Sequence, residues 1–185
     1  ERKNLFGEAL NVLSENGDYV RTGYDHFALA NDEIARSMKK GQMRWNALGV
    51  TTGRYHNIIG IGVHSYSTIG KYYFQNVYEI EDYEAALTKA ELPVYRGKEL
   101  STDDILRRDI IQRIRNYFHL SMAEIEKLYD IDFKSYFESE LRNLRQFAED
   151  GLVEIVDDTI VVTETGHQFT AIVCRIFDKY YNGNL

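Results

Sequence analysis

The chain has 185 residues, of which 44% are hydrophobic and 28% are charged, and its formal net charge is -7. A chain of this length and composition is expected to form one domain, or one and a half, around an apolar core. The acidic balance disfavours broad nucleic-acid binding, because such binding needs a basic surface.

Features that the sequence lacks narrow its class further. No run of about 18 apolar residues is present to span a membrane, and the opening Glu1-Arg2-Lys3-Asn4 has neither a signal peptide nor an initiator Met. We therefore expect a trimmed piece of a cytoplasmic protein. The single cysteine, Cys174, excludes an internal disulfide and any metal cluster held only by cysteines of this chain.

The N-terminal part predicts a short alternation of helix and strand. Apolar residues at helical spacing predict a helix over 3–15, and a strand is expected over 19–23. A second helix is expected over 31–40, capped by Asn31 and ended by Gly41. One helix and one strand cannot close a sheet, so this part is expected to be the tail of a larger α/β domain.

The middle of the chain is rich in glycine, β-branched and aromatic residues, which predicts strands near 47–52, 58–66 and 71–75. Gly60 and Gly62 interrupt the second strand pattern, which indicates a bulge or a close approach of ligand or backbone. A short helix is expected over 80–90, followed by an extended link that begins at the only proline, Pro93.

From Ser101 the pattern becomes mostly helical. Ser101 and Asp104 are expected to cap a helix that ends near Phe118, and Ser121 with Glu124 forms a capping box for a short second helix.

A long third helix is expected from Asp132 to Gly151, with a hairpin turning at Asp157-Asp158 and Thr163 capping a last helix. The order helix, helix, helix, strand, strand, helix is winged-helix-like and raises DNA binding as a function. The helix over 132–150, however, has three basic residues against five acidic ones, a net charge of -2. A helix that enters the major groove needs positive charge, so a structural packing domain is favoured.

Two groups of residues could carry chemistry. Arginine forks suit carboxylate or phosphate ligands, although a solvated face with intrahelical pairs to Asp103, Asp104 and Asp109 is favoured for any single arginine. The basic residues of this first group are Arg96, Lys98, Arg107, Arg108, Arg113 and Arg115.

The second group is an Asp-His pair. Asp25 could orient His26 for proton transfer, but a hydrogen-bonded structural histidine is more common.

Four segments together resemble oxygen-independent coproporphyrinogen III oxidase, over nearly the whole chain. They are "GYDHFALANDEIARSMKKGQMRWNALGVTT" at 23–52, "IIGIGVHSYSTIG" at 58–70, "VYRGKELSTDDILRRDIIQRI" at 94–114 and "DGLVEI" at 150–155. Each motif is modest alone, and their order and spacing together are specific. The resemblance is to the C-terminal half of that family of radical S-adenosylmethionine (SAM) enzymes.

The resemblance implies an α+β fold, with the last α/β elements of a partial barrel over 1–92 and a mostly helical, winged-helix-like cover domain over 93–185. In the family, a CxxxCxxC motif holds a [4Fe-4S] cluster that cleaves SAM. The adenosyl radical then takes hydrogen from a propionate of coproporphyrinogen III, and loss of CO2 leaves a vinyl group. This chain has no CxxxCxxC motif, so the cluster is expected in an upstream barrel domain of the parent protein, and the piece alone is expected to be inactive.

The resemblance also implies site residues. Asp25 and His26 match the family's Asp-His-Phe-Ala segment. Asn46 matches its His-Arg-Asn-Phe-Gln segment and Gly49 the Gly-Tyr-Thr-Thr turn that follows, whereas Leu48 replaces the glutamine, which helps to bind a second SAM. The residues expected to contact cofactor are Leu48, Gly49 and Tyr66, and those expected to contact the tetrapyrrole substrate are Asp25, His26, Arg44, Asn46, Arg107 and Arg108.

Two alternatives stay open: a haem-binding or haem-trafficking relative without decarboxylase activity, and a winged-helix interaction module. The isolated piece is also expected to self-associate through exposed apolar surface and an open strand edge.

Overall fold

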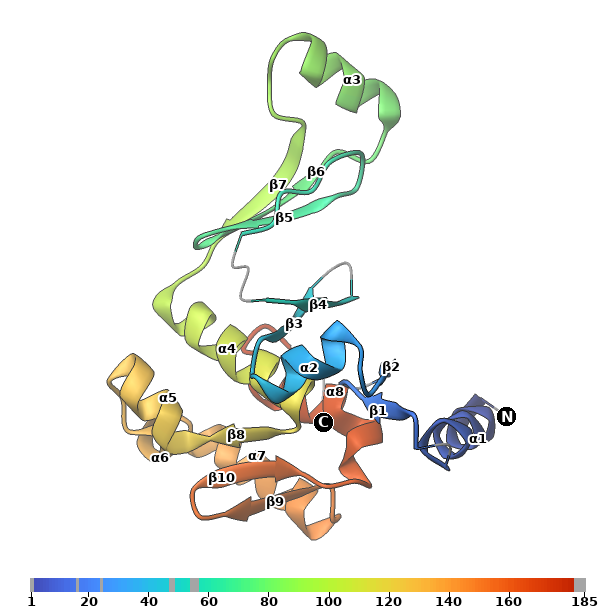
Figure 1. Cartoon of the computed structure of the whole chain (residues 1–185). Coiled ribbons are helices and arrows are strands. Elements are labelled where there is room, and N and C mark those ends of the chain that lie inside the picture. Colours follow the sequence, from blue (N-terminus) through green and yellow to red (C-terminus); the bar gives the residue numbers. More distant parts are fainter. Residues whose placement is uncertain (1, 16, 24, 47–48, 54–56, 182–185) are drawn as a thin grey trace. The chain divides into compact units, whose positions relative to one another are not determined.

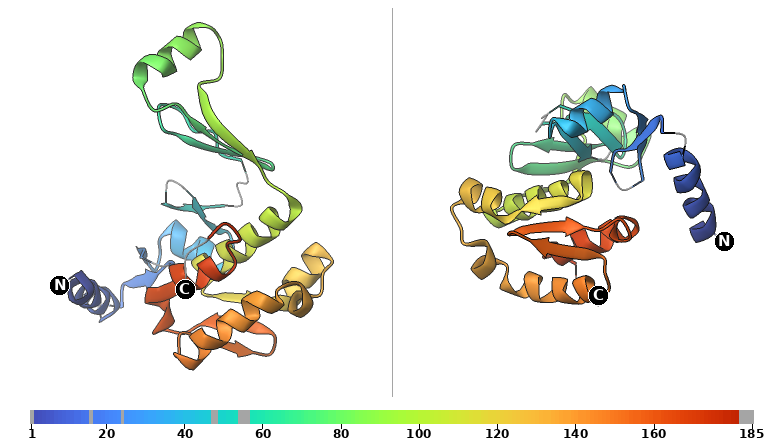
Figure 2. Two further views of the ribbon diagram at one scale, coloured as in Figure 1. Left: turned by 180° about the vertical axis from the view of Figure 1, so that it is seen from behind. Right: turned by 60° about the horizontal axis from the view of Figure 1, so that its bottom comes forward.

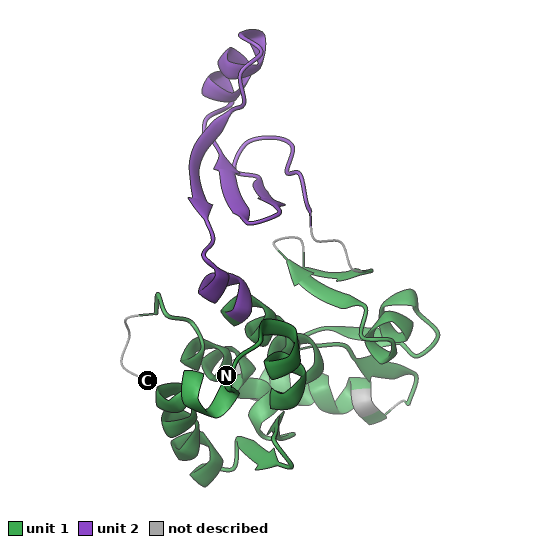
Figure 3. Cartoon of the chain, turned by 90° about the vertical axis from the view of Figure 1, so that its left-hand side faces the viewer, with its two compact units in different colours: residues 1–53, 107–185 green, residues 54–106 purple. Residues whose placement is uncertain are grey.

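The computed structural model describes residues 2–15, 17–23, 25–46, 49–53 and 57–181 (Figure 1). Contacts divide the chain into two compact units, residues 1–53 with 107–185 and residues 54–106 (Figure 3). Helices and strands are mixed throughout, so the expectation of an α+β fold is confirmed at this level. No helix among the described residues is both long and apolar enough to cross a membrane.

The larger unit begins with the predicted helix, α1 (Arg2–Glu15), followed by two short antiparallel strands, β1 (Tyr19–Arg21) and β2 (Phe27–Leu29). The next helix, α2 (Glu33–Lys39), is capped by Asp32, whose carboxylate accepts a hydrogen bond from the backbone of Ile34 at 2.7 Å. The prediction of Asn31 as the cap was therefore wrong by one residue.

The second strand pair of this unit is formed by β3 (Met43–Asn46) and β4 (Gly49–Thr52). The strand expected over 47–52 is confirmed at 49–52, and residues 47–48 lie outside the described residues. The partner strand β3 was not predicted.

The C-terminal part of the larger unit is built on a three-stranded antiparallel sheet in the order β8-β10-β9. The expected hairpin is confirmed, and both Asp157 and Asp158 adopt positive φ at its turn. Helix α7 packs against β9 and α8 (Figure 2). The elements are α4 (Thr102–Tyr117), β8 (His119–Ser121), α5 (Met122–Tyr129), α6 (Phe133–Tyr136), α7 (Glu138–Glu149), β9 (Val153–Val156), β10 (Thr159–Val162), the 3-10 turn η1 (Gly166–Phe169) and α8 (Thr170–Ile176).

Capping explains most boundaries in this part. Ser101 and Asp104 exchange hydrogen bonds as predicted, and the hydroxyl of Ser121 accepts from the backbone of Glu124. The single helix expected from Asp132 was wrong, because the backbone leaves helical geometry at Phe137 and divides it into α6 and α7.

The break at Phe137 accompanies an aromatic core. The rings of Phe133 and Phe177 lie 4.8 Å and 5.6 Å from that of Phe137, and all three side chains are fully buried. Burial of this much aromatic surface stabilises the unit by several kcal/mol, at about 25 cal/mol per Å².

The smaller unit contains a three-stranded antiparallel sheet, β5-β6-β7, and one helix. The strand expected over 58–66 was wrong, because apart from a single bridge at Ile58 the pairing begins only at Tyr66. The predicted close approach is confirmed at Gly60, where a Cβ atom would lie 2.6 Å from the carbonyl oxygen of Tyr66. The elements are β5 (Tyr66–Ile69), β6 (Tyr72–Asn76), α3 (Ile80–Thr88) and β7 (Val94–Glu99), the last formed by the link that was expected to be only extended.

Candidate functional site

An Asp-His pair lies in the turn between β1 and β2. The turn is closed by the backbone N–H of Thr22, which donates to the carbonyl oxygen of His26 at 2.8 Å. Asp25 Oδ1 lies 2.7 Å from His26 Nδ1, and both side chains are partly exposed. Since the carboxylate holds Nδ1, the ring presents Nε2 as the atom available to a ligand.

The β3-β4 pair brings a glycine to this histidine. A Cβ atom on Gly49 would lie 3.6 Å from His26 Nε2, and Gly49 has a φ of +104°, which disfavours any other residue. Three residues predicted from the sequence, Asp25, His26 and Gly49, therefore come together. We name these three the His26 cluster.

Two further predicted residues belong to the same strand pair. Asn46 pairs with Gly49 in the register, and its side chain donates to the hydroxyl of Thr51 at 3.0 Å. That hydroxyl donates in turn to the carbonyl oxygen of Arg44 at 3.3 Å. Alternation along β3 puts the Arg44 and Asn46 side chains on one face of the strand and Trp45 on the other.

Helix α4 fastens β3 through polar side chains that were not singled out from the sequence. Gln112 accepts from the backbone N–H of Trp45 at 3.2 Å and donates to its carbonyl oxygen at 2.8 Å. Tyr117 and Asn116 both donate to the carbonyl oxygen of Met43. Gln112 and Asn116 stand four residues apart, so the signal available in the sequence was a pair of amide side chains on one face of the helix.

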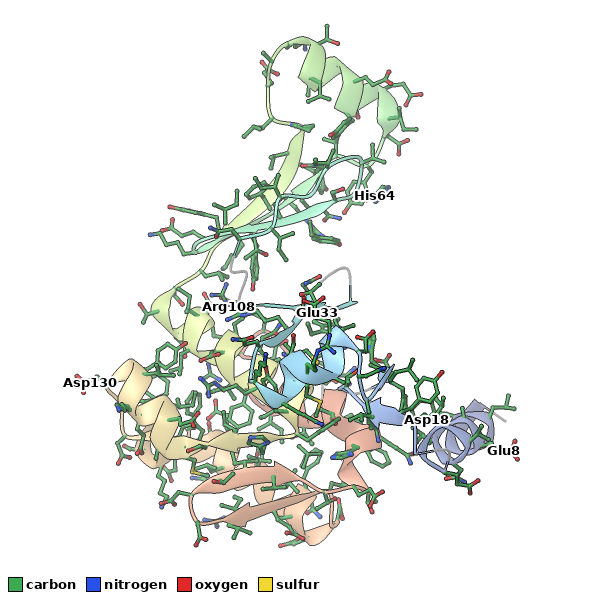
Figure 4. The ribbon with its side chains drawn as sticks, in the orientation of Figure 1. Glu8, Asp18, Glu33, His64, Arg108 and Asp130 are labelled. Atoms are coloured by element: carbon green, nitrogen blue, oxygen red, sulfur yellow. The ribbon has the colours of Figure 1, made fainter. Side chains whose placement is uncertain are left out.

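Helix α2 supports the other strand of the pair. Glu33, at the start of α2, lies near β4 (Figure 4), and the Thr52 hydroxyl donates to its carboxylate at 3.4 Å. The β3-β4 pair is thus held from both sides within the larger unit.

The arginines of α4 do not share one surface site. Arg107 Nη1 lies 2.8 Å from Glu140 Oε1 and also donates to the carbonyl oxygen of Phe177, in a largely buried position. Arg113 pairs with Asp109, as the intrahelical interpretation expects, and with Glu124. Arg108 is half-buried on the same helix (Figure 4), and Arg115 stacks on Trp45.

Two predicted cofactor residues remain. Tyr66 begins β5 in the smaller unit and is 54% exposed, while Leu48 is outside the described residues. Arg96, in the same unit, donates from Nε to the side chain of Gln75 at 2.9 Å.

A second histidine cluster was not anticipated. The His167 ring stacks on Phe118 with 3.7 Å between centroids, and Arg21 Nη1 lies 3.5 Å from His167 Nδ1. Burial, and then the charge of Arg21, lower the pKa of His167 below its ordinary value. This cluster joins β1 to the C-terminal part of the larger unit with a neutral imidazole.

The described residues do not fit an iron-sulfur cluster. No group of three or more His, Cys, Asp or Glu side chains that could hold a metal occurs in the described ranges. Burial raises the pKa of the Cys174 thiol to about 12, so it is not a thiolate ligand.

Comparisons with known proteins agree with the resemblance. Residues 100–169 match the HemN C-terminal domain family. The chain is 37% identical over 162 residues to an oxygen-independent coproporphyrinogen III oxidase of Pseudomonas aeruginosa, covering 88% of this chain and 35% of the relative. It is 35% identical over 176 residues to that of Helicobacter pylori, covering 95% of this chain and 38% of the relative.

A solved structure agrees as well. Coproporphyrinogen III oxidase (HemN) from Escherichia coli, described as a radical SAM enzyme, superposes with a TM-score of 0.87 at 33% identity, covering 94% of this chain and 40% of that one. The chain therefore spans between a third and two-fifths of the length of these proteins.

Proposed function

The chain belongs to the oxygen-independent coproporphyrinogen III oxidase family, whose C-terminal part it matches, and we propose that it serves in a radical SAM enzyme. The proposed reaction is oxidative decarboxylation of coproporphyrinogen III propionates to vinyl groups. A SAM molecule and a [4Fe-4S] cluster, held by an upstream barrel domain of the same protein, would supply the radical chemistry. No step is assigned to them within this chain.

The observation that carries the proposal is the His26 cluster beside Asn46. The Asp25 carboxylate fixes the imidazole, and Gly49 leaves the space in front of Nε2 free of a side chain. With Nδ1–H donated to Asp25, the protonated imidazolium also donates Nε2–H to a carboxylate oxygen, which suits a propionate. We assign to His26 and Asn46 the binding of substrate, and to Gly49 the close approach of ligand to the backbone.

The division into a barrel end over 1–92 and a winged-helix-like cover over 93–185 remains part of this proposal. The three-stranded sheet β8-β10-β9 with α4, α5 and α7 supports the second half of it. The cover would close the cavity and shield the reaction from water.

Contact with an upstream domain, or between copies of the isolated chain, is supported by exposed apolar side chains. On α1, Leu5 is 60% exposed and Val12 is 58% exposed. Light scattering of the isolated chain should show self-association that grows with concentration. A monodisperse monomer at high concentration would contradict this part of the proposal.

The positions of two arginines support different roles for them. Arg44 stays a candidate substrate residue, since it shares a face of β3 with Asn46. For Arg107 we propose a structural role instead, because Glu140 and Phe177 already occupy its guanidinium.

The experiment uses the full-length protein that contains this chain, reconstituted without oxygen and supplied with SAM, reductant and coproporphyrinogen III. Formation of protoporphyrinogen is measured after oxidation to the fluorescent porphyrin. Removal of one hydrogen bond to a charged group in His26→Ala should raise KM about 10- to 100-fold. Arg142→Gln, which changes an exposed residue of α7, should leave KM unchanged. Wild-type protein with a loaded cluster and no product would refute the proposal.

A haem-binding relative is the second candidate, and it is favoured by Leu48 at the position of a SAM-binding glutamine. Absorbance titration with haem distinguishes it, since the absence of a shifted Soret band would exclude this alternative.

A further inference from the structure

The guanidinium of Arg115 stands out among the charged groups of the larger unit. Its central carbon lies 3.8 Å from the centre of the Trp45 ring, and its Nε is buried without a hydrogen-bond partner. No carboxylate of the described residues forms an ion pair with it. The side chain as a whole is only partly buried, so part of the guanidinium is open to solvent although Nε is not.

An N–H group of a charged side chain that is buried and unpaired is unfavourable, because it has lost water without gaining another acceptor. The other arginines that α4 contributes near this position, Arg107 and Arg113, each have a carboxylate partner. Arg115 therefore combines two unmet requirements, an acceptor for Nε and a negative charge.

Trp45 makes the geometry of this arginine definite. Stacking of a guanidinium on an indole face fixes the plane of the fork and leaves its edge free for an acceptor. Trp45 is itself held by the two hydrogen bonds from Gln112, one turn before Arg115 on the same helix. The stacked pair of Trp45 and Arg115 is thus held by β3 and α4 together.

The backbone of Arg115 also lies near the turn that carries His26, because a Cβ atom on Gly23 would lie 3.7 Å from the carbonyl oxygen of Arg115.

We infer that Arg115, stacked on Trp45, binds one carboxylate group of a ligand. The carboxylate chemistry follows from these residues alone. Its identification with a propionate of a tetrapyrrole rests on the proposed function. The site adds to the His26 cluster, since the backbone of Arg115 approaches Gly23 in the turn that carries His26.

The test uses the 185-residue chain, whose only tryptophan is Trp45, so that its fluorescence reports on this site. Sodium propionate is titrated against sodium chloride at matched ionic strength, and the Arg115 Nε–Hε signal is followed by NMR. We expect a saturable change of both signals in the wild type, and loss of the fluorescence change in Arg115→Gln. Arg142→Gln should respond like the wild type.

Two results overturn the inference. A response that does not saturate, or a fluorescence response that persists in Arg115→Gln, removes the carboxylate site. A titration with coproporphyrin III then distinguishes failure of this inference from failure of the proposed function. If wild type and Arg115→Gln bind it with equal affinity, the propionate assignment is overturned and the proposed function still stands. At least tenfold weaker binding by Arg115→Gln supports the assignment.

Discussion

Replacement of Arg107 by methionine should destabilise the larger unit strongly. The side chains of Arg107 and Glu140 are only 15% and 11% exposed, and they pair at 2.8 Å. Removing one partner of such a pair leaves a buried charge and costs about 3–5 kcal/mol. Ser139 still donates to the second carboxylate oxygen of Glu140 at 2.7 Å, so the expected loss is at the lower end, about 3 kcal/mol.

Urea unfolding followed by the fluorescence of Trp45 measures this loss, because that residue lies in the same unit. Arg142→Met is the matched control: its pair with Glu138 is similarly short at 2.9 Å, but the side chains are 68% and 75% exposed, so it should cost less than about 1 kcal/mol. Arg107→Met combined with Glu140→Leu should recover part of the loss. If Arg107→Met were no more destabilising than Arg142→Met, the structural role of Arg107 would be wrong.

Three further predictions concern single residues. The pKa of His167 is lowered in the fold by burial and Arg21, so the unfolded state takes up the proton first. The unfolding free energy should therefore fall as pH drops below about 6.5 and level off below the pKa of the folded state. In urea titrations His167→Gln should remove this pH-dependent component, and a variant with the same pH profile as the wild type would contradict the prediction. Gly49→Ala should cost about 1–3 kcal/mol in the same assay, because a φ of +104° strains any residue other than glycine; a neutral effect would contradict this backbone geometry. Cys174, whose pKa burial raises to about 12, should react with a thiol reagent only after unfolding in urea, and rapid reaction of the folded chain would refute its burial.

Elements with local signals could be predicted from the sequence. Ser121 with Glu124 marked the start of α5, and Asp157-Asp158 marked the hairpin, because caps and turns depend on neighbouring residues. Phe133 and Phe137 show the limit of such signals. Their spacing fits one helix or two, and only packing against Phe177 accompanies the break.

The strand β3 could not be predicted, because it has four residues and its support comes from a distant helix. Trp45 and Gln112, which hold it to α4, are 67 positions apart. The same reason applies to the site. The pairing of Asp25 with His26 could be expected from adjacent residues, whereas the approach of Gly49 to that ring needs two strand pairs to fold together.

The partners of the arginines also could not be predicted from the sequence. Charge and spacing identified Arg107 and Arg115 as candidate ligands of anions, but Glu140 is 33 positions from Arg107. The difference between a buried ion pair and an unpaired guanidinium on Trp45 appears only in the structure.

The central claim is that this chain lines a tetrapyrrole cavity through the His26 cluster and β3. The most direct measurement is a backbone NMR titration of the 185-residue chain with coproporphyrin III. We expect saturable shifts that are largest at residues 22–29 and 43–52 and around Arg115. Shifts that are absent, or that are confined to the β9-β10 hairpin, would contradict the claim.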